Sequence, residues 1–174
     1  EIPTDNKEML FAFSIKTYSD CAFYGGTYDV TVDEELLHEV SFAISTTTFK
    51  KEDYIKKNVE MVRKELIADS YMGQHWYMHV VDNGRTLDKD EIESDHIYYH
   101  PNKNVGGAGG FARGMIEVLD QKEPVTHVLL MDDDVLIYAE ALRRTYYLLH
   151  MIKDEYKEHF ISGAMMKLEE MNVF

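Results

Sequence analysis

Three consecutive carboxylates, Asp132-Asp133-Asp134, directly follow the short apolar run of residues 128–131. Such a run is typical of a strand that is buried on both faces. Side chains alternate along a strand, so Asp132 and Asp134 are predicted to share one side, about 7 Å apart at their Cα atoms. Two carboxylates this close repel each other unless a cation lies between them. Oxygen ligands suit hard ions, so the pair predicts a site for Mg²⁺ or Mn²⁺, with a solvated acidic loop as the alternative.

A glycine cluster, Asn-Val-Gly-Gly-Ala-Gly-Gly-Phe-Ala-Arg-Gly, occupies residues 104–114 and leads into a helical pattern. Glycines at a helix entrance let a diphosphate approach backbone N–H groups, and the helix N-terminus adds partial positive charge. Arg113 lies close enough to that entrance to reach a phosphate or a sugar hydroxyl. The cluster therefore predicts a diphosphate site, and a flexible connection before an ordinary helix is the alternative.

The same cluster also satisfies the Gly/Ala form of the dinucleotide fingerprint, as Gly107-x-Gly109-x-x-Ala112. Asp132 follows 20 residues later, where that fold keeps its ribose-binding acid. Two features weigh against an NAD(P)-binding oxidoreductase. The fingerprint should follow the first strand, and a ribose needs one acid rather than three.

Polar residues also end two earlier strands of the predicted sheet. Thr46-Thr47-Thr48 follows an apolar strand at residues 40–45, and Asp82-Asn83-Gly84 follows one at residues 76–81. The second triplet fits a tight turn and a nucleoside contact equally well. Because parallel strands bring their carboxyl ends to one edge, these residues and the acidic triplet predict a nucleotide site there.

Two pairs of histidines, His75 with His79 and His96 with His100, have the four-residue spacing of a helical zinc pair. Both pairs fall on predicted strands, where four residues span about 13 Å, too far for one ion to bridge. They are interpreted as surface or interface histidines.

The elements that must position these residues alternate between strands and helices from residue 40 onward. Three helices are indicated by apolar residues at helical spacing. These residues are Ile55, Val59, Val62 and Leu66; Phe111, Met115, Val118 and Leu119; and Leu142, Tyr146, Leu149, Ile152 and Tyr156. The pattern predicts an α/β fold, with a Rossmann-like, mostly parallel sheet and helices on both faces.

The first part of the chain has a different rhythm. Residues 9–32 alternate apolar and polar side chains, interrupted by Gly25-Gly26, and are predicted to form strands. Two strands bury little alone, so they are expected to belong to a larger β-rich domain. The predicted domains are 1–38, the trailing strands of that β-rich piece, and 39–174, a nucleotide-binding domain.

Composition narrows the possible partners. The formal net charge of −14 argues against nucleic acid and against broad adhesion to anionic lipid. The single Cys21 fits a reducing compartment, and no apolar run reaches the roughly 20 residues that span a bilayer. A cytoplasmic protein is expected, with peripheral association of the full-length protein at the inner face of the membrane kept open.

Four segments together resemble glycosyltransferase family 2. They are the segment around Thr48 and Lys51, the segment around Asp82 and Asn83, the glycine cluster and the acidic triplet. The closest likeness is to the bacterial galactofuranosyltransferases that build galactan, with rhamnosyltransferases nearby. The resemblance implies a GT-A fold, a UDP-sugar donor such as UDP-galactofuranose, Mn²⁺ or Mg²⁺, and inverting transfer to a cell-surface or capsular glycan.

The resemblance also implies roles for individual residues. Thr48 and Asp82 would contact the uridine, the glycine cluster and Arg113 the diphosphate and sugar, and Asp132 and Asp134 the metal. The full predicted nucleotide-sugar set is Thr48, Lys51, Asp82, Asn83, Asn104, Gly106, Gly107, Gly109, Gly110, Arg113 and Asp133. The family often has Arg where this chain has Lys51, which would reduce that contact to a point charge.

The general base of the family lies well after the acidic triplet and is expected beyond Phe174. This chain is therefore expected to be incomplete for catalysis. The oligomeric state stays open. Besides the oxidoreductase, a catalytically silent nucleotide-binding domain is kept as an alternative.

Overall fold

The computed structural model describes residues 12–168 of the chain. Contacts divide the chain into two compact units, Glu1–Thr31 and Val32–Phe174. The second unit holds every helix and strand of the described residues. The predicted strands at residues 9–32 are wrong for residues 12–32, and residues 9–11 lie outside the described part. All side chains of 12–32 are exposed, and an alternating pattern forms a strand only where another strand accepts its hydrogen bonds. The domain division at residue 38 stays a prediction.

Four parallel strands form the sheet, in the order β3-β2-β1-β4. Their bounds are β1 Phe42–Thr48, β2 Trp76–Asp82, β3 Ile97–Pro101 and β4 His127–Asp132. The predicted α/β fold with a parallel sheet is confirmed. β1 includes the threonines that were predicted to follow it. Thr48 pairs with Asp82 of β2, and Thr47 pairs with Asp132 of β4. These pairings bring the carboxyl ends of three strands to the same level.

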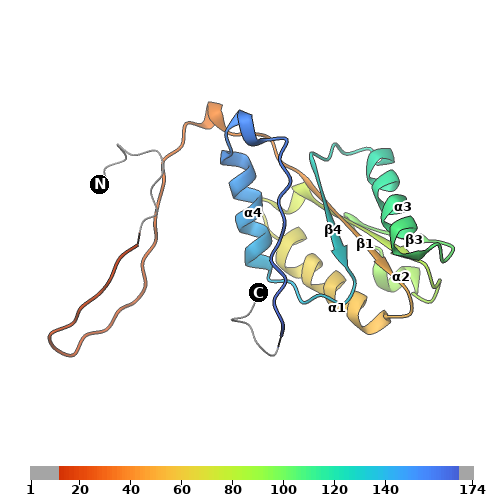
Figure 1. The fold of residues 1–174 in the computed structure, drawn as a ribbon, viewed down its shortest axis with the longest axis horizontal. Helices are drawn as coiled ribbons and strands as arrows, with labels where there is room; N and C mark the ends of the chain where they lie inside the picture. The colour runs from red at the N-terminus through yellow and green to blue at the C-terminus, as the bar shows by residue number, and fades with distance from the viewer. Residues whose placement is uncertain (1–11, 169–174) are drawn as a thin grey trace. The chain divides into compact units, whose positions relative to one another are not determined.

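Helices cover both faces of this sheet (Figure 1). α1 (Glu52–Val62), which continues as a π-helical turn η2 (Arg63–Ile67), and α4 (Ala139–Met151) share one face, and α3 (Gly106–Asp120) covers the other. The shorter elements are η1 Glu34–Leu36, η3 Gly73–His75, α2 Lys89–Ile92 and η4 Asp154–Tyr156. The predicted apolar face of α1 is confirmed, since Ile55, Val59, Val62 and Leu66 are all buried in the main core.

α3 packs on the sheet mainly through glycine, with Val118 as the buried member of the predicted apolar stripe. Gly110, Gly114 and Val118 are its buried residues, whereas Leu119 is 82% exposed. A Cβ at Gly110 would lie 2.1 Å from Thr47 Cγ2, and one at Gly114 would lie 2.0 Å from Ser45 Oγ. Of the predicted stripe of Phe111, Met115, Val118 and Leu119, Val118 is buried as expected, whereas Met115 and Leu119 are exposed. The glycines that face the sheet carry no signal in an apolar pattern.

α4 also differs from its predicted length. Tyr146 and Leu149 are buried as expected, but the helix ends at Met151. His38 holds this end, since its backbone N–H donates to His150 O at 2.9 Å and its ring lies 2.8 Å from Ile152 O. These contacts use carbonyl groups at the helix end, and Tyr156 instead lies in η4.

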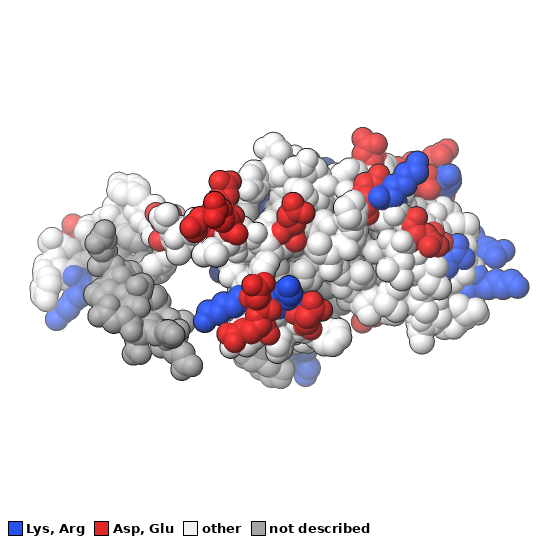
Figure 2. Space-filling view, turned by 90° about the horizontal axis from the view of Figure 1, so that it is seen from above, with Lys and Arg blue, Asp and Glu red and all other residues white. Residues whose placement is uncertain are grey.

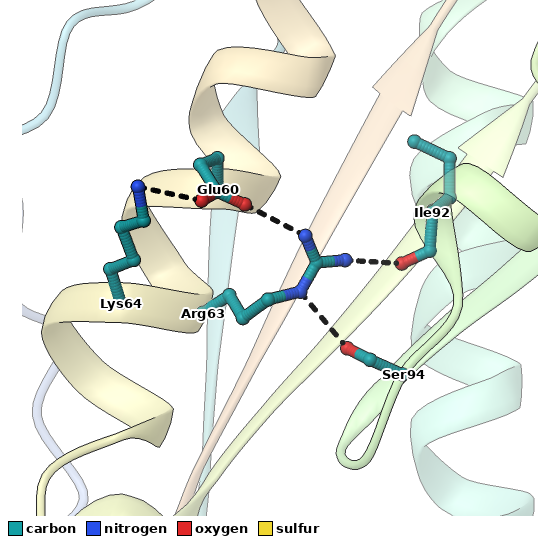
Figure 3. A network of polar contacts seen from close by, with 5 residues as sticks. All are labelled: Glu60, Arg63, Lys64, Ile92 and Ser94. Carbon is teal, nitrogen blue, oxygen red and sulfur yellow. Dashed lines mark hydrogen bonds and ion pairs between the residues drawn. The ribbon is translucent and has the colours of Figure 1, made fainter.

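Arg63 fastens the end of α1 to the segment between α2 and β3 (Figure 3). Its guanidinium donates to Ile92 O at 3.2 Å and to Ser94 Oγ at 3.3 Å, and pairs with Glu60 at 2.8 Å. Lys64 shares the same Glu60 carboxylate at 2.9 Å. One cation thus connects α1 with the segment that leads into β3.

β4 is the edge strand of the described sheet next to β1. Val128 is 41% and Leu130 50% exposed, whereas Met131 is buried in the main core. The expectation of a strand buried on both faces is therefore wrong. α3 lies mainly over β1 and β2, so it leaves the Val128 side of β4 uncovered.

Charged side chains of both signs are spread over the surface. The face drawn in Figure 2 carries several groups of acidic side chains, some of them with basic neighbours. None of the described helices is long and apolar enough to cross a membrane.

His79 is a core residue, so its interpretation as a surface histidine is wrong. It is 2% exposed, and its Nδ1 lies 3.0 Å from His100 Nε2 on the neighbouring strand β3. Its Nε2 lies 2.8 Å from Gln121 Oε1, just after α3. The His79 ring thus connects β2 and β3 by hydrogen bonds to the residue that follows α3.

We expect acid to weaken the fold through this histidine. Burial lowers the pKa of His79 below its ordinary value, and contacts with Gln121 and Glu117 oppose that shift only in part. The unfolded chain, whose histidine keeps a pKa of about 6.5, therefore binds the proton more readily as the pH falls. The free energy of unfolding should fall as the pH drops from about 7 toward 5. Urea unfolding at both values measures this, and His79→Gln should reduce the difference.

His159→Gln is the matched control, because His159 is exposed. An equal pH dependence in both variants would contradict a role for His79.

Candidate functional site

A pocket of about 350 Å³ lies at the carboxyl edge of the sheet. Its volume is within the usual range for small-molecule sites, about 300–1,000 Å³. The residues that line it are Thr47, Thr48, Phe49, Lys51, Asn83, Asn104, Gly106, Gly107 and Asp133. In the order β3-β2-β1-β4 the chain moves outward from β1 to β3 and then returns across the sheet to β4 beside β1. The pocket therefore lies next to the point at which the strand order reverses, the switch point where open α/β sheets bind ligands.

The entrance of α3 forms one wall of the pocket. Gly106 has φ +76, a conformation that glycine adopts without strain, and its N–H donates to Asn104 Oδ1 at 3.2 Å. Asn83 Nδ2 donates to Gly106 O at 3.1 Å, and Asn102 Nδ2 donates to Asn83 Oδ1 at 2.9 Å. A Cβ at Gly107 would meet nothing within 4 Å. The first turn of α3 is therefore held in place, and its free N–H groups favour an anion.

Thr48 contributes a hydroxyl to the same pocket. Its side chain is 2% exposed, and its Oγ1 has no hydrogen-bond partner among the described residues. A buried hydroxyl left without a partner costs about 1–3 kcal/mol, so a ligand that bonded to it would recover that cost. A polar ligand group that reached Thr48 would therefore gain a hydrogen bond.

The acidic triplet leaves the strand earlier than predicted. β4 ends at Asp132, and Asp133 and Asp134 lie in the following turn. Side chains alternate only inside a strand, so alternation does not place Asp132 and Asp134 on one side as predicted. Asn58 on α1, itself buried, fixes this turn by donating its side-chain amide to Asp133 O at 2.9 Å.

Lys51, at the start of α1, lies against two of the three acids. Its Nζ donates to Asp134 Oδ2 at 2.5 Å and lies 3.6 Å from Asp133 Oδ1. The hydrogen bond from Lys51 lowers the pKa of Asp134, and the same bond raises the pKa of Lys51. The acidic turn therefore already holds a positive charge.

No group of three or more His, Cys, Asp or Glu side chains within residues 12–168 is arranged to hold a metal. A divalent ion held by the predicted pair Asp132 and Asp134 would take its other ligands from water or a phosphate, which is usual for Mg²⁺. The ammonium group beside Asp133 and Asp134 indicates that a cation fits this position. The metal assignment to Asp132 and Asp134 stays a prediction.

Asp82 lies beneath the pocket rather than in its wall. It is 0% exposed, and its carboxylate accepts hydrogen bonds from the backbone of Gly84, Thr86 and Leu87 and from the Tyr99 hydroxyl. These bonds fix the turn after β2, as the tight-turn interpretation expects. Its predicted uridine contact is untested by this structure.

Three other residues predicted to bind the nucleotide sugar do not line the pocket, and neither do the predicted metal ligands Asp132 and Asp134. A Cβ at Gly109 would contact Val105, and Gly110 packs on Thr47. Arg113 pairs with Glu117 one turn further along α3. The predicted contact between Arg113 and a diphosphate would require this ion pair to open, and it stays a prediction.

Three residues of the site were not predicted from the sequence: Phe49, which lines the pocket, and Asn58 and Asn102, which hold its walls through the bonds described above. Thr47, which also lines the pocket, belongs to the threonine run predicted at this edge. The position of Phe49 beside Thr48 was the available signal for an aromatic wall. Asn58 lay in an apolar helix pattern, and nothing in that pattern indicated its partner.

The chain is similar in part to a known enzyme. Over 76 residues it is 32% identical to the galactofuranosyltransferase GlfT2 of Mycolicibacterium smegmatis. The similarity is to a glycosyltransferase. The match covers 44% of this chain and 11% of GlfT2, so the chain spans a small part of that protein. No known family model matches the chain, and its membership of family 2 stays a prediction.

Proposed function

We propose that this chain carries the donor-nucleotide site of a glycosyltransferase that uses a UDP-sugar, with UDP-galactofuranose as the leading donor. The acceptor would be a cell-surface or capsular glycan. One observation carries the proposal: a pocket at the switch point combines a helix N-terminus, a buried hydroxyl and an acidic turn. The partial similarity to GlfT2 supports the same class of reaction.

Within the proposal, each wall of the pocket takes one part of the donor. The N–H groups of the first turn of α3 from Gly107 onward would bind the diphosphate. Thr48 and Asn83 would offer polar contacts to the uridine, beside the half-exposed ring of Phe49, against which a nucleobase would stack. These are the interactions that hold the donor while the sugar transfers.

Asp132 and Asp134 would hold the divalent ion. Mn²⁺ or Mg²⁺ there would supply positive charge that stabilises the departing UDP. The acceptor hydroxyl would attack the anomeric carbon and give its proton to a carboxylate base. No described residue is assigned to that base.

Calorimetric titration of UDP and of NAD, each with Mn²⁺ and with EDTA, tests the proposal. We expect UDP to bind, and Mn²⁺ to tighten its binding by roughly tenfold or more, since a metal that bridges phosphate and carboxylate adds a strong contact. Asp134→Ala should remove the Mn²⁺ enhancement and leave the fold intact, because Asp134 is exposed.

Equal UDP affinity in Mn²⁺ and in EDTA would contradict the metal site. Binding of NAD in preference to UDP would instead support the oxidoreductase alternative, whose fingerprint lies in α3.

A further inference from the structure

The position of Lys51 is unexpected for a residue that binds nucleotide only. Its side chain belongs to the pocket wall, yet its ammonium group is bonded to Asp134 and lies close to Asp133. Asp133 is 7% exposed, and Lys51 is the cation paired with it among the described residues. A buried carboxylate needs such a partner.

We infer that Lys51 is an internal counter-cation of the acidic turn, which a divalent ion must displace and which then turns to the donor phosphates. This inference rests on the proposed function, because it concerns the same metal and nucleotide. Lys51 would couple binding of the metal to binding of the nucleotide.

The first half of the inference follows from electrostatics. The Lys51 ammonium group lies on Asp134 Oδ2, so a divalent ion bound by the same carboxylate would lie close to it, and two neighbouring cations repel each other. The turn itself has little freedom to separate the two sites, because Asn58 holds Asp133 O from α1. Binding of the metal without nucleotide therefore breaks the contact between Lys51 and Asp134.

The second half follows from the pocket. Lys51 and the first turn of α3 line the same space, so a displaced ammonium group already lies beside the proposed diphosphate site. An ammonium–phosphate contact would then replace the lost ion pair. Metal alone breaks an ion pair, and bound UDP offers the freed ammonium group a phosphate in its place, so each ligand should strengthen binding of the other.

The test is Mn²⁺ binding to the full chain, measured by electron paramagnetic resonance of the free ion, followed by UDP titration in saturating Mn²⁺. In Lys51→Met we expect Mn²⁺ alone to bind roughly two- to fivefold tighter, because the competing ion pair is partly exposed. UDP in the presence of Mn²⁺ should bind roughly fivefold or more weakly in this variant, because a charged hydrogen bond is lost. A residue that only stabilises the fold would not produce these opposite changes.

Lys56→Met is the matched control for charge. Lys56 lies on the same helix and pairs with Glu91, outside the pocket. Lys56→Met should show how far the loss of one positive charge alone changes Mn²⁺ affinity. This variant should leave UDP binding unchanged.

The outcomes separate the two proposals. Equal Mn²⁺ affinities in Lys51→Met and Lys56→Met, with Mn²⁺ bound to the unmodified chain, overturn the inference alone. Failure of Mn²⁺ to bind any of the three proteins overturns the inference and the metal site together. Mn²⁺ binding that is measurable only in Lys51→Met supports displacement of Lys51 in its strongest form.

Discussion

Gly110→Ala should destabilise the fold by about 2–3 kcal/mol, as expected for an extra methyl group forced into a packed contact. The new Cβ would lie 2.1 Å from Thr47 Cγ2, 2.7 Å from Thr47 Oγ1 and 3.0 Å from Thr47 Cβ. Rotation of the threonine cannot relieve this contact, because both of its γ atoms and its Cβ are involved. Chemical denaturation monitored by circular dichroism measures the loss.

A double-mutant cycle with Thr47→Ala gives the decisive comparison. Removal of both γ atoms should restore about 1–2 kcal/mol in the Gly110→Ala background, since contacting residues couple by this amount. Additive effects of the two substitutions would mean that α3 does not rest on β1 through this pair.

Gly107→Val should weaken UDP binding by roughly 100-fold while the chain still folds. A Cβ at this position meets nothing within 4 Å, so the substitution leaves the protein's own packing unchanged. The branched side chain would instead enter the space proposed for the diphosphate and keep it from the N–H groups of α3. Calorimetry with UDP in Mn²⁺ gives the affinity, and thermal unfolding gives the stability.

Gly163→Val is the control for this prediction, because a Cβ at Gly163 also meets nothing within 4 Å and Gly163 lies outside the pocket. It should leave UDP affinity unchanged. If Gly107→Val binds UDP as well as Gly163→Val does, the entrance of α3 is not the diphosphate site.

The parallel sheet could be predicted because β1, β2 and β4 are apolar runs separated by helical patterns. The orientation of α3 could not. Its sheet-facing positions are Gly110 and Gly114, which add nothing to an apolar count, while the conspicuous Leu119 faces solvent. Close approach of two backbones is a tertiary property that periodicity does not report.

The pocket followed from the ends of the strands, and seven of the predicted residues line it: Thr48, Lys51, Asn83, Asn104, Gly106, Gly107 and Asp133. The geometry of the acids did not follow, because the residue at which β4 stops depends on its neighbour β1 and on Asn58. The alternation in residues 12–32 was misleading for a related reason. It describes a strand's two faces and says nothing about whether a partner strand exists.

β4, the edge strand of the sheet within residues 12–168, also affects how copies of this chain behave in concentrated solution. An edge strand offers N–H and C=O groups to another chain, and the exposed Val128 and Leu130 add apolar surface to it. The net charge of −14 opposes such encounters by mutual repulsion. Salt screens that repulsion, with a Debye length of about 10 Å at 0.1 M, and leaves the apolar attraction in place. Colloidal stability should therefore be greatest at low ionic strength, and light scattering should rise as sodium chloride is added.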